Sequence, residues 1–307
     1  MKNIKELAEQ KPKLTPGHRL CPGCGASIAV NQALSVIEQP VVVSCATGCL
    51  EVSTTPFPYT AWATPFIHSA FENAAATITG IETAYRSLKK QGKIDKDIKF
   101  VAFGGDGGTY DIGLQALSGA VERGHDFLYI CYDNGAYMNT GIQRSSATPL
   151  GAATTTEPPG SESSGKVQWR KDLTMIMAAH DIPYAAQASI GYWKDYMKKV
   201  EKAVSIKGPA FINVMSTCPR GWRTKDEETV SLAKEAVTCL FWPLYEVEEG
   251  KVKVTVKPVK QTNIEDWIKK QGRFKHLFKA GNEQVLEQIR NGVQTRWEHM
   301  LKLEALD

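Results

Sequence analysis

A glycine-rich turn, Phe103-Gly104-Gly105-Asp106-Gly107-Gly108, carries the clearest chemical signal in the sequence. Glycines let backbone amides approach a bulky anion such as a diphosphate, and a helix that follows the turn adds its positive end. A carboxylate in the middle of such a turn repels a phosphate unless a cation lies between them. Asp106 therefore indicates a divalent ion, with Mg²⁺ favoured because it bridges carboxylate and diphosphate oxygens. The structural alternative is a tight turn with an aspartate cap.

Seven cysteines offer a second kind of chemistry. In a reducing compartment, thiolate ligands are a better expectation than disulfides. The segment Cys21-Pro22-Gly23-Cys24-Gly25 has the form of a zinc knuckle or of an iron–sulfur ligand pair. The sequence holds no second pair at this spacing, so further ligands must be single cysteines. The candidates are Cys45, Cys49, Cys131, Cys218 and Cys239.

Hydrophobic patterning predicts the elements that position these residues. Short apolar strands alternate with helices, which is typical of an α/β protein with an open, mostly parallel sheet covered by helices on both faces. We expect strands at 40–44, 98–103, 127–132, 184–188 and 210–215, and helices at 26–37, 70–90, 109–123, 171–180 and 191–204. Residues 134–168 form a long loop rich in Gly, Ser, Thr and Pro, and loops of this length are commonly functional.

Beyond Pro219 the alternation stops. A strand pair near 244–256 and a helix near 282–303 are expected there, in a segment too small for a good core of its own. We therefore predict one domain at 1–220, with a polar lead-in over residues 1–20. Residues 221–307 are predicted to be a C-terminal extension that packs on this domain or on a partner subunit.

Strand ends bring the chemical residues together. Asn134 follows the strand after the Asp106 turn, and open α/β sheets bind ligands at the edge where parallel strands end. Cys49 and Cys218 emerge at the same edge, whereas Cys45 and Cys131 fall in or beside apolar strands and are expected to be buried core thiols. Four thiolates, Cys21, Cys24, Cys49 and Cys218, are thus candidates for one metal centre near the diphosphate site. The residues alone leave open a structural zinc ion or a [4Fe–4S] cluster that carries electrons.

Composition narrows the class of protein. The chain has 307 residues, a net charge of +4, 42% hydrophobic and 23% charged residues, as is ordinary for a globular protein. It contains no apolar run of the roughly 18 residues that a membrane span needs. The stretch Met1–Glu6 lacks the apolar core of a signal peptide, so we expect a cytoplasmic protein. Residues 251–307 hold 12 Lys/Arg against 7 Asp/Glu, and these interspersed charges favour a solvated face or a subunit contact over nucleic-acid binding.

The Gly-Asp-Gly turn, followed 28 residues later by an asparagine, resembles the thiamine diphosphate signature. In proteins with that signature the aspartate, the asparagine side chain and a main-chain carbonyl two residues later hold Mg²⁺. The resemblance therefore implies Asp106, Asn134 and Ala136 as the Mg²⁺ ligands of this chain.

With the cysteines added, the sequence closely resembles the β subunits of 2-oxoacid:ferredoxin oxidoreductases, above all those that act on pyruvate. The likeness runs from about Pro16 to Trp242. Besides the segments already quoted, it rests on Ala46-Thr47-Gly48-Cys49-Leu50-Glu51, Phe57-Pro58-Tyr59-Thr60-Ala61-Trp62, His68-Ser69-Ala70-Phe71-Glu72-Asn73-Ala74, the run from Tyr132 to Gly141, and Cys218-Pro219.

The resemblance implies the thiamine diphosphate-binding fold and a [4Fe–4S] cluster on Cys21, Cys24, Cys49 and Cys218. It also implies that Asn139 points towards the thiazolium where substrate reacts, with a loop-capping amide as the alternative. The further cofactor-binding residues that it implies are Thr47, Gly48, Gly105, Gly107, Gly108 and Thr140. His68 and Glu72, one helical turn apart, are interpreted as a packed helix-end pair rather than as catalytic groups.

The implied activity is oxidative decarboxylation of a 2-oxoacid in anaerobic metabolism. Pyruvate is the expected substrate, coenzyme A the acyl acceptor and ferredoxin the electron acceptor. The chain has only one α/β domain, and in this family the glutamate that activates the aminopyrimidine ring comes from a separate subunit. We therefore expect partner subunits of the α, γ or δ type, and no activity without them.

Three alternatives stay open at this point. One is the same chemistry on oxalate, which needs no coenzyme A, or on branched or aryl 2-oxoacids. Another is a non-redox thiamine decarboxylase or carboligase with a structural zinc. The third is a zinc-bound scaffold without catalysis.

Overall fold

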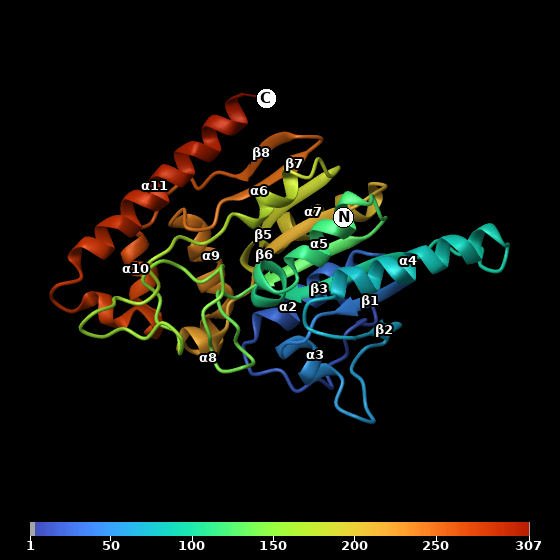
Figure 1. The fold of residues 1–307 in the computed structure, drawn as a ribbon, viewed down its shortest axis with the longest axis horizontal. Helices are drawn as coiled ribbons and strands as arrows, with labels where there is room; N and C mark the ends of the chain where they lie inside the picture. Colours follow the sequence, from blue (N-terminus) through green and yellow to red (C-terminus); the bar gives the residue numbers. More distant parts are fainter. Residues whose placement is uncertain (1–3, 307) are drawn as a thin grey trace.

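The computed structural model describes residues 4–306, so residues 1–3 of the predicted lead-in and residue 307 of the predicted extension lie outside the described residues. Eight strands form one sheet in the order β2-β1-β3-β4-β6-β5-β7-β8 (Figure 1). Their bounds are β1 (Val41–Cys45), β2 (Phe66–Ile67), β3 (Lys99–Gly105), β4 (Leu128–Asp133), β5 (Tyr184–Ser189), β6 (Ala210–Met215), β7 (Leu244–Glu248) and β8 (Lys251–Val256). The first six strands pair in parallel, and β7 and β8 add an antiparallel edge.

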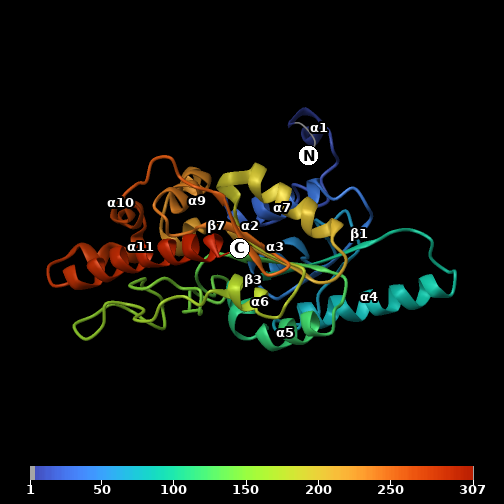
Figure 2. The same cartoon turned by 90° about the horizontal axis from the view of Figure 1, so that it is seen from above.

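Helices cover both faces of this sheet. In Figure 2, α2, α7 and α9 lie on one face, and α4, α5 and α6 lie on the other. The helices are α1 (Ile4–Ala8), α2 (Gly25–Ser35), α3 (Cys49–Thr54), α4 (Ala74–Lys90), α5 (Leu114–Glu122), α6 (Leu173–Ala178), α7 (Trp193–Ser205), α8 (Pro219–Trp222), α9 (Thr229–Thr238), α10 (Ile264–Lys269) and α11 (Glu283–Ala305). Each face has its own apolar core.

The central strands are apolar along their whole length. Every residue of β4, β5 and β6 is buried, as expected for parallel strands with helices on both sides. The predicted α/β class with an open, mostly parallel sheet is therefore confirmed. The predicted helix over residues 70–90 begins later, at Ala74, because residues 68–73 are irregular and His68 contacts the Cys45 carbonyl at the end of β1.

The segment beyond residue 220 continues the sheet. Strand β7 pairs antiparallel with β5, and β8 folds back on β7 through Glu249 and Gly250, which both have positive φ angles. Helix α11 packs against β8. The strand pair and the final helix are confirmed, whereas α9 and α10 were not predicted. The division of the chain at residue 220 stays a prediction.

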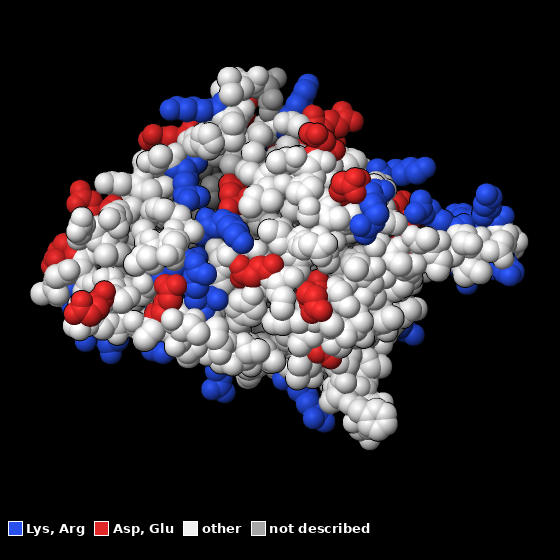
Figure 3. All heavy atoms as spheres, in the orientation of Figure 1, with Lys and Arg blue, Asp and Glu red and all other residues white. Residues whose placement is uncertain are grey.

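Charges are mixed over the face in Figure 3. Basic side chains gather along the projecting end of α4, where Lys89 and Lys90 are exposed, and acidic groups lie among the other basic ones. Within residues 4–306, none of the helices has both the length and the apolar character that a bilayer span requires.

Two helical glycines make a matched test of the packing between the cysteine-bearing loops. A Cβ at Gly25, the first residue of α2, would lie 2.7 Å from the carbonyl oxygen of Thr217, whereas a Cβ at Gly80 in α4 would meet nothing. We expect Gly25→Ala to lower the free energy of unfolding by about 1–3 kcal/mol, because the backbones must separate. Gly80→Ala should raise it by about 0.5–1 kcal/mol, since alanine favours the helix. Guanidinium denaturation measures both, and equal effects would contradict the close packing.

Candidate cofactor site

A small hollow lies at the edge where the parallel strands end. All of the residues predicted to bind thiamine diphosphate or Mg²⁺ line it: Thr47, Gly48, Cys49, Gly105, Asp106, Gly107, Gly108, Asn134, Ala136, Asn139 and Thr140. Phe71, Tyr132, Tyr137 and Met138 complete the lining. The hollow has a volume of only about 40 Å³, far below the roughly 300–1,000 Å³ of a ligand pocket. This chain therefore supplies one wall of a site.

Asp106 lies at the centre of this wall. It directly follows β3 and precedes a π-helical turn, Gly107–Asp111. One carboxyl oxygen accepts a hydrogen bond from the backbone N–H of Asn134 (3.2 Å), and the other accepts one from the Ser145 hydroxyl. Burial and the nearby Asp133 carboxylate raise the pKa of Asp106 to about 8. The site thus concentrates carboxyl groups that a cation would stabilise.

Asp133 is neutralised within the protein. Its Oδ2 accepts hydrogen bonds from the Tyr110 hydroxyl (2.6 Å) and from Arg170, which also forms an ion pair with it. The Asn213 amide donates to the same Tyr110 oxygen (2.6 Å). This buried network fixes the end of β4 and so orients Asn134, the next residue. Sequence reasoning missed it, because Arg170 lies in a loop without periodic pattern.

Lys166 orders the long loop that follows Asn134. Its Nζ donates to the carbonyl oxygens of Ser145, Ser146 and Thr148 at 3.2, 3.2 and 2.7 Å. The side chain is 1% exposed, and burial lowers the pKa of Lys166 to about 8. Because Ser145 donates a hydrogen bond to Asp106, Lys166 fixes the position of a residue that orients the Asp106 carboxyl group. No motif marks this lysine in the sequence.

The cysteine-bearing loops pack backbone against backbone. Gly25 donates its N–H to the Thr217 carbonyl (3.1 Å), and Gly23 has a φ of +68° where a Cβ would lie 2.3 Å from the carbonyl oxygen of Asp226. Cys24 precedes α2, Cys218 precedes α8, and Cys49 is the first residue of α3. Three helix starts therefore converge beside the hollow.

The four thiols influence one another. Burial raises the pKa of Cys49 to about 12, with further contributions from Cys218, Cys24 and Cys21. Burial, Cys24 and Cys21 likewise raise the pKa of Cys218 to about 11. Between residues 4 and 306, however, no three histidine, cysteine or acidic side chains are close enough to hold a single metal ion. Cys49 and Cys218 lie close enough to the other two thiols for their pKa values to be affected.

Unpartnered polar atoms lie near these thiols. The Tyr132 hydroxyl, the Ser216 hydroxyl and Nη1 of Arg273 are buried without a hydrogen-bond partner. Tyr132 lies close to Gly48, where a Cβ would be 3.1 Å from the hydroxyl, and Ser216 lies against Gly25. Buried donors without acceptors are costly, and together with the thiols they fit a site that receives an anionic group.

Other predictions about these side chains have mixed outcomes. Cys45 and Cys131 are confirmed as buried core thiols. The interpretation of His68 and Glu72 as a helix-end pair is wrong, because both precede α4 and His68 instead contacts the Cys45 carbonyl (2.9 Å) and the Thr47 hydroxyl (3.3 Å). His68 therefore supports a residue that lines the hollow.

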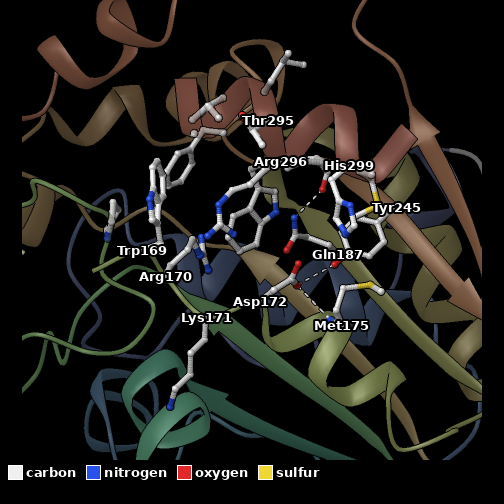
Figure 4. A pocket seen from close by; sticks show the side chains of 18 of the residues that line it. Trp169, Arg170, Lys171, Asp172, Met175, Gln187, Tyr245, Thr295, Arg296 and His299 are labelled. Carbon is white, nitrogen blue, oxygen red and sulfur yellow. Dashed lines mark hydrogen bonds between the residues drawn. The ribbon is translucent and has the colours of Figure 1, made fainter. Parts of the chain in front are cut away.

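A second and larger hollow, of about 600 Å³, lies between α11 and the sheet (Figure 4). Arg296 enters it from α11 and stacks on Trp169, with 5.0 Å between guanidinium carbon and ring centre. On the other wall, Arg170 stacks on Trp242 at 4.3 Å. The hollow thus shares Arg170 with the network that fixes Asp133.

Comparison with known proteins defines the class of protein first. Residues 46–214 match the family "Thiamine pyrophosphate enzyme, C-terminal TPP binding domain". A solved structure, 2-oxoglutarate:ferredoxin oxidoreductase from Magnetococcus marinus, superposes with a TM-score of 0.57 at 23% identity, covering 76% of this chain and 81% of that one. The fold is thus that of the thiamine diphosphate-binding domain of a thiamine-dependent enzyme.

Sequence relatives narrow the class to a family. "Pyruvate synthase subunit PorB" of Thermotoga maritima is 52% identical over 99% of this chain and 97% of its own length. "Ketoisovalerate oxidoreductase subunit VorB" of Pyrococcus abyssi is 44% identical over 94% and 92%. The chain belongs to the β subunits of the 2-oxoacid:ferredoxin oxidoreductases. It is therefore one subunit of a thiamine-dependent oxidoreductase, and neither the carboligase nor the scaffold alternative is favoured.

The raised pKa of Asp106 gives a pH-dependent prediction. Between pH 5 and 7 the folded chain keeps a proton that the unfolded chain, with a pKa near 3.8, has released. Stability therefore falls as the pH rises, by up to about 1.4 kcal/mol per unit, and levels off above pH 8. Asp106→Asn abolishes this dependence, so its stability relative to wild type should grow from pH 5 to 7. Urea denaturation of the metal-free chain tests this, with exposed Asp97→Asn as control; parallel profiles for all three would contradict it.

Proposed function

We propose that this chain is the thiamine- and cluster-bearing subunit of a pyruvate:ferredoxin oxidoreductase, which converts pyruvate and coenzyme A to acetyl-CoA and CO₂ while it reduces ferredoxin. One observation carries the proposal. Cys49 lines the same hollow as Asp106 and Asn134, and it is also electrostatically coupled to Cys218, Cys24 and Cys21. A cluster held by these thiols would therefore lie beside the diphosphate site, and short separation is what electron transfer between two cofactors needs.

Each proposed cofactor has its own residues. Mg²⁺ is assigned to the side chains of Asp106 and Asn134 and to the carbonyl of Ala136. The thiamine diphosphate is assigned to the glycines and threonines of the hollow, namely Thr47, Gly48, Gly105, Gly107, Gly108 and Thr140, with Cys49 beside them. When bound, thiamine acts as the electron sink for decarboxylation. Asn139 is assigned to the reacting end of the cofactor.

The chain's own residues contribute orientation and charge. Asp106 is held by Asn134 and Ser145, and Ser145 is held in turn by Lys166. This preorganised carboxyl group offers a cation two fixed oxygens, so little reorganisation is needed on binding. The unpartnered hydroxyls of Tyr132 and Ser216 offer donors to an anionic group between the thiols.

Partner subunits of the α, γ or δ type are proposed to close the open side of the hollow. A wall of this size cannot enclose thiamine diphosphate alone. The loop after α3 carries two strongly exposed aromatic residues, Phe57 and Tyr59, at 97% and 72% exposure, which is unusual on a free surface. We also propose a cytoplasmic location, since a thiolate-held cluster needs a reducing compartment.

A [4Fe–4S] cluster on Cys21, Cys24, Cys49 and Cys218 is proposed rather than zinc. The thiols influence one another's pKa, which supports one shared centre. A cluster that carries electrons, unlike zinc, suits the oxidoreductase family to which the chain belongs.

The metal content tests this choice. Iron, zinc and acid-labile sulfide are measured per chain in enzyme co-expressed with its partner subunits and purified without oxygen. We expect the double variant Cys21→Ser with Cys218→Ser to lose four iron and four sulfide relative to wild type. Cys239→Ser is the matched control, because this thiol is buried in the apolar core at the end of α9 and is not one of the four proposed ligands. Loss of one zinc instead would remove the redox mechanism.

Pyruvate is proposed over other 2-oxoacids, because the PorB relative matches this chain over nearly its full length at higher identity than the VorB relative does. The assembled enzyme should reduce ferredoxin with pyruvate in a reaction that requires coenzyme A. Its kcat/KM should be at least tenfold lower with 2-oxoisovalerate or oxalate. Turnover of oxalate without coenzyme A would overturn the substrate assignment and leave the cofactor assignment intact.

A further inference from the structure

Arg273 is a buried cation without an anionic partner. Its side chain belongs to the segment Gly272–Phe278 and is 3% exposed. Nε donates to the Gln271 side chain (3.0 Å), but Nη1 has no hydrogen-bond partner. No carboxylate among residues 4–306 forms an ion pair with it. An unpaired buried charge is strongly destabilising unless something absent from the chain compensates it.

The position of Arg273 shows where this compensation must come from. Its guanidinium carbon lies 4.0 Å from the centre of the Trp222 ring, on the short helix that begins after Cys218. The guanidinium also lies close to the residue after Asn134, since a Cβ at Gly135 would be 2.9 Å from Nη1. The Trp222 indole also donates to the Asn134 carbonyl (2.6 Å). Arg273 is therefore placed between the cysteine loops and the Asp106 cradle.

Two anionic groups could match this cation, a thiolate-bound cluster or the diphosphate. Burial lowers the pKa of Arg273 to about 9, which leaves it charged at neutral pH. Asp133, Cys218 and Asp106 oppose this lowering, in that order, and Asp133 is already paired with Arg170. The diphosphate already has Mg²⁺ as its own proposed cation, whereas a [4Fe–4S] cluster with four thiolate ligands keeps a net negative charge that no other proposed group offsets. The cluster is therefore the better match.

We propose that Arg273 is the internal counter-cation of the iron–sulfur centre at Cys218 and raises its reduction potential. This rests on the [4Fe–4S] cluster proposed above. One-electron reduction adds a negative charge to the cluster, and a fixed guanidinium in a buried, weakly polarisable environment stabilises the reduced form more than the oxidised form. The C-terminal segment thereby sets how readily the cluster accepts an electron.

A redox titration of the assembled enzyme tests the proposal. The cluster signal is followed by electron paramagnetic resonance and assigned by its loss in Cys218→Ser. We expect Arg273→Met to lower the ratio of reduced to oxidised cluster about tenfold at a fixed ambient potential, which is 59 mV for one electron. Arg273→Lys, which keeps the charge, should shift the ratio less than threefold. Arg296→Met, which removes another tryptophan-stacked arginine far from Cys218, should leave it unchanged.

The outcomes separate the hypotheses. An intact cluster with wild-type potential in Arg273→Met overturns the role of Arg273, and so does an unchanged potential with tenfold weaker thiamine diphosphate binding. If Arg273→Met fails to assemble, Arg273→Gln replaces it, since glutamine keeps hydrogen-bond donors without the charge. A cluster potential in Arg273→Gln equal to that in Arg273→Lys would also overturn the role of Arg273. Absence of a Cys218-dependent signal from the wild-type enzyme would instead refute the cluster itself.

Discussion

Strands β1, β3, β4 and β6 are hydrogen-bonded in parallel, so that Cys45 pairs with Phe103, Gly105 with Tyr132, and Asp133 with Met215. Because these pairs lie at the carboxyl ends of the strands, the chain leaves all four strands at the same edge of the sheet. The turns that carry Asp106, Asn134 and the single cysteines are thereby brought together by the backbone of the sheet. The site depends on this register, since a shift of one residue would reverse every side chain at the edge.

Buried charge is arranged in two different ways around the site. Asp133 and Arg170 neutralise each other within the protein, and Tyr110 and Asn213 complete their hydrogen bonds. Arg273, by contrast, forms no ion pair with a carboxylate among residues 4–306, and its Nη1 has no hydrogen-bond partner. The paired charges fix the end of β4, whereas a buried cation without such a partner favours an anion beside it. Removing either member of a buried pair leaves the other charge uncompensated, which is strongly destabilising.

The residues whose positions depend on local pattern and on the strands that precede them could be predicted from the sequence. Asp106, Asn134, Cys49 and Cys218 could be placed at one edge because each lies at most a few residues past the end of a recognisable strand, and the hollow contains all of the expected cofactor residues. Ser145, Lys166 and Arg273 could not be predicted. They act through irregular segments that contact the site only after folding, and neither apolar periodicity nor spacing marks such long-range contacts. His68 was misjudged because the start of α4 was placed too early.

The contact of Gly23 and Gly25 with Asp226 and Thr217 has a consequence for biosynthesis. The thiols of Cys21 and Cys24 leave the ribosome long before Cys218 is made. At about 5–20 residues per second, the intervening chain takes roughly 10–40 s to synthesise. During that interval the first two thiols have no neighbours from the later strands. A metallocentre built from all four cysteines can therefore be completed only after Cys218 has been synthesised. Its insertion would follow translation of most of the chain.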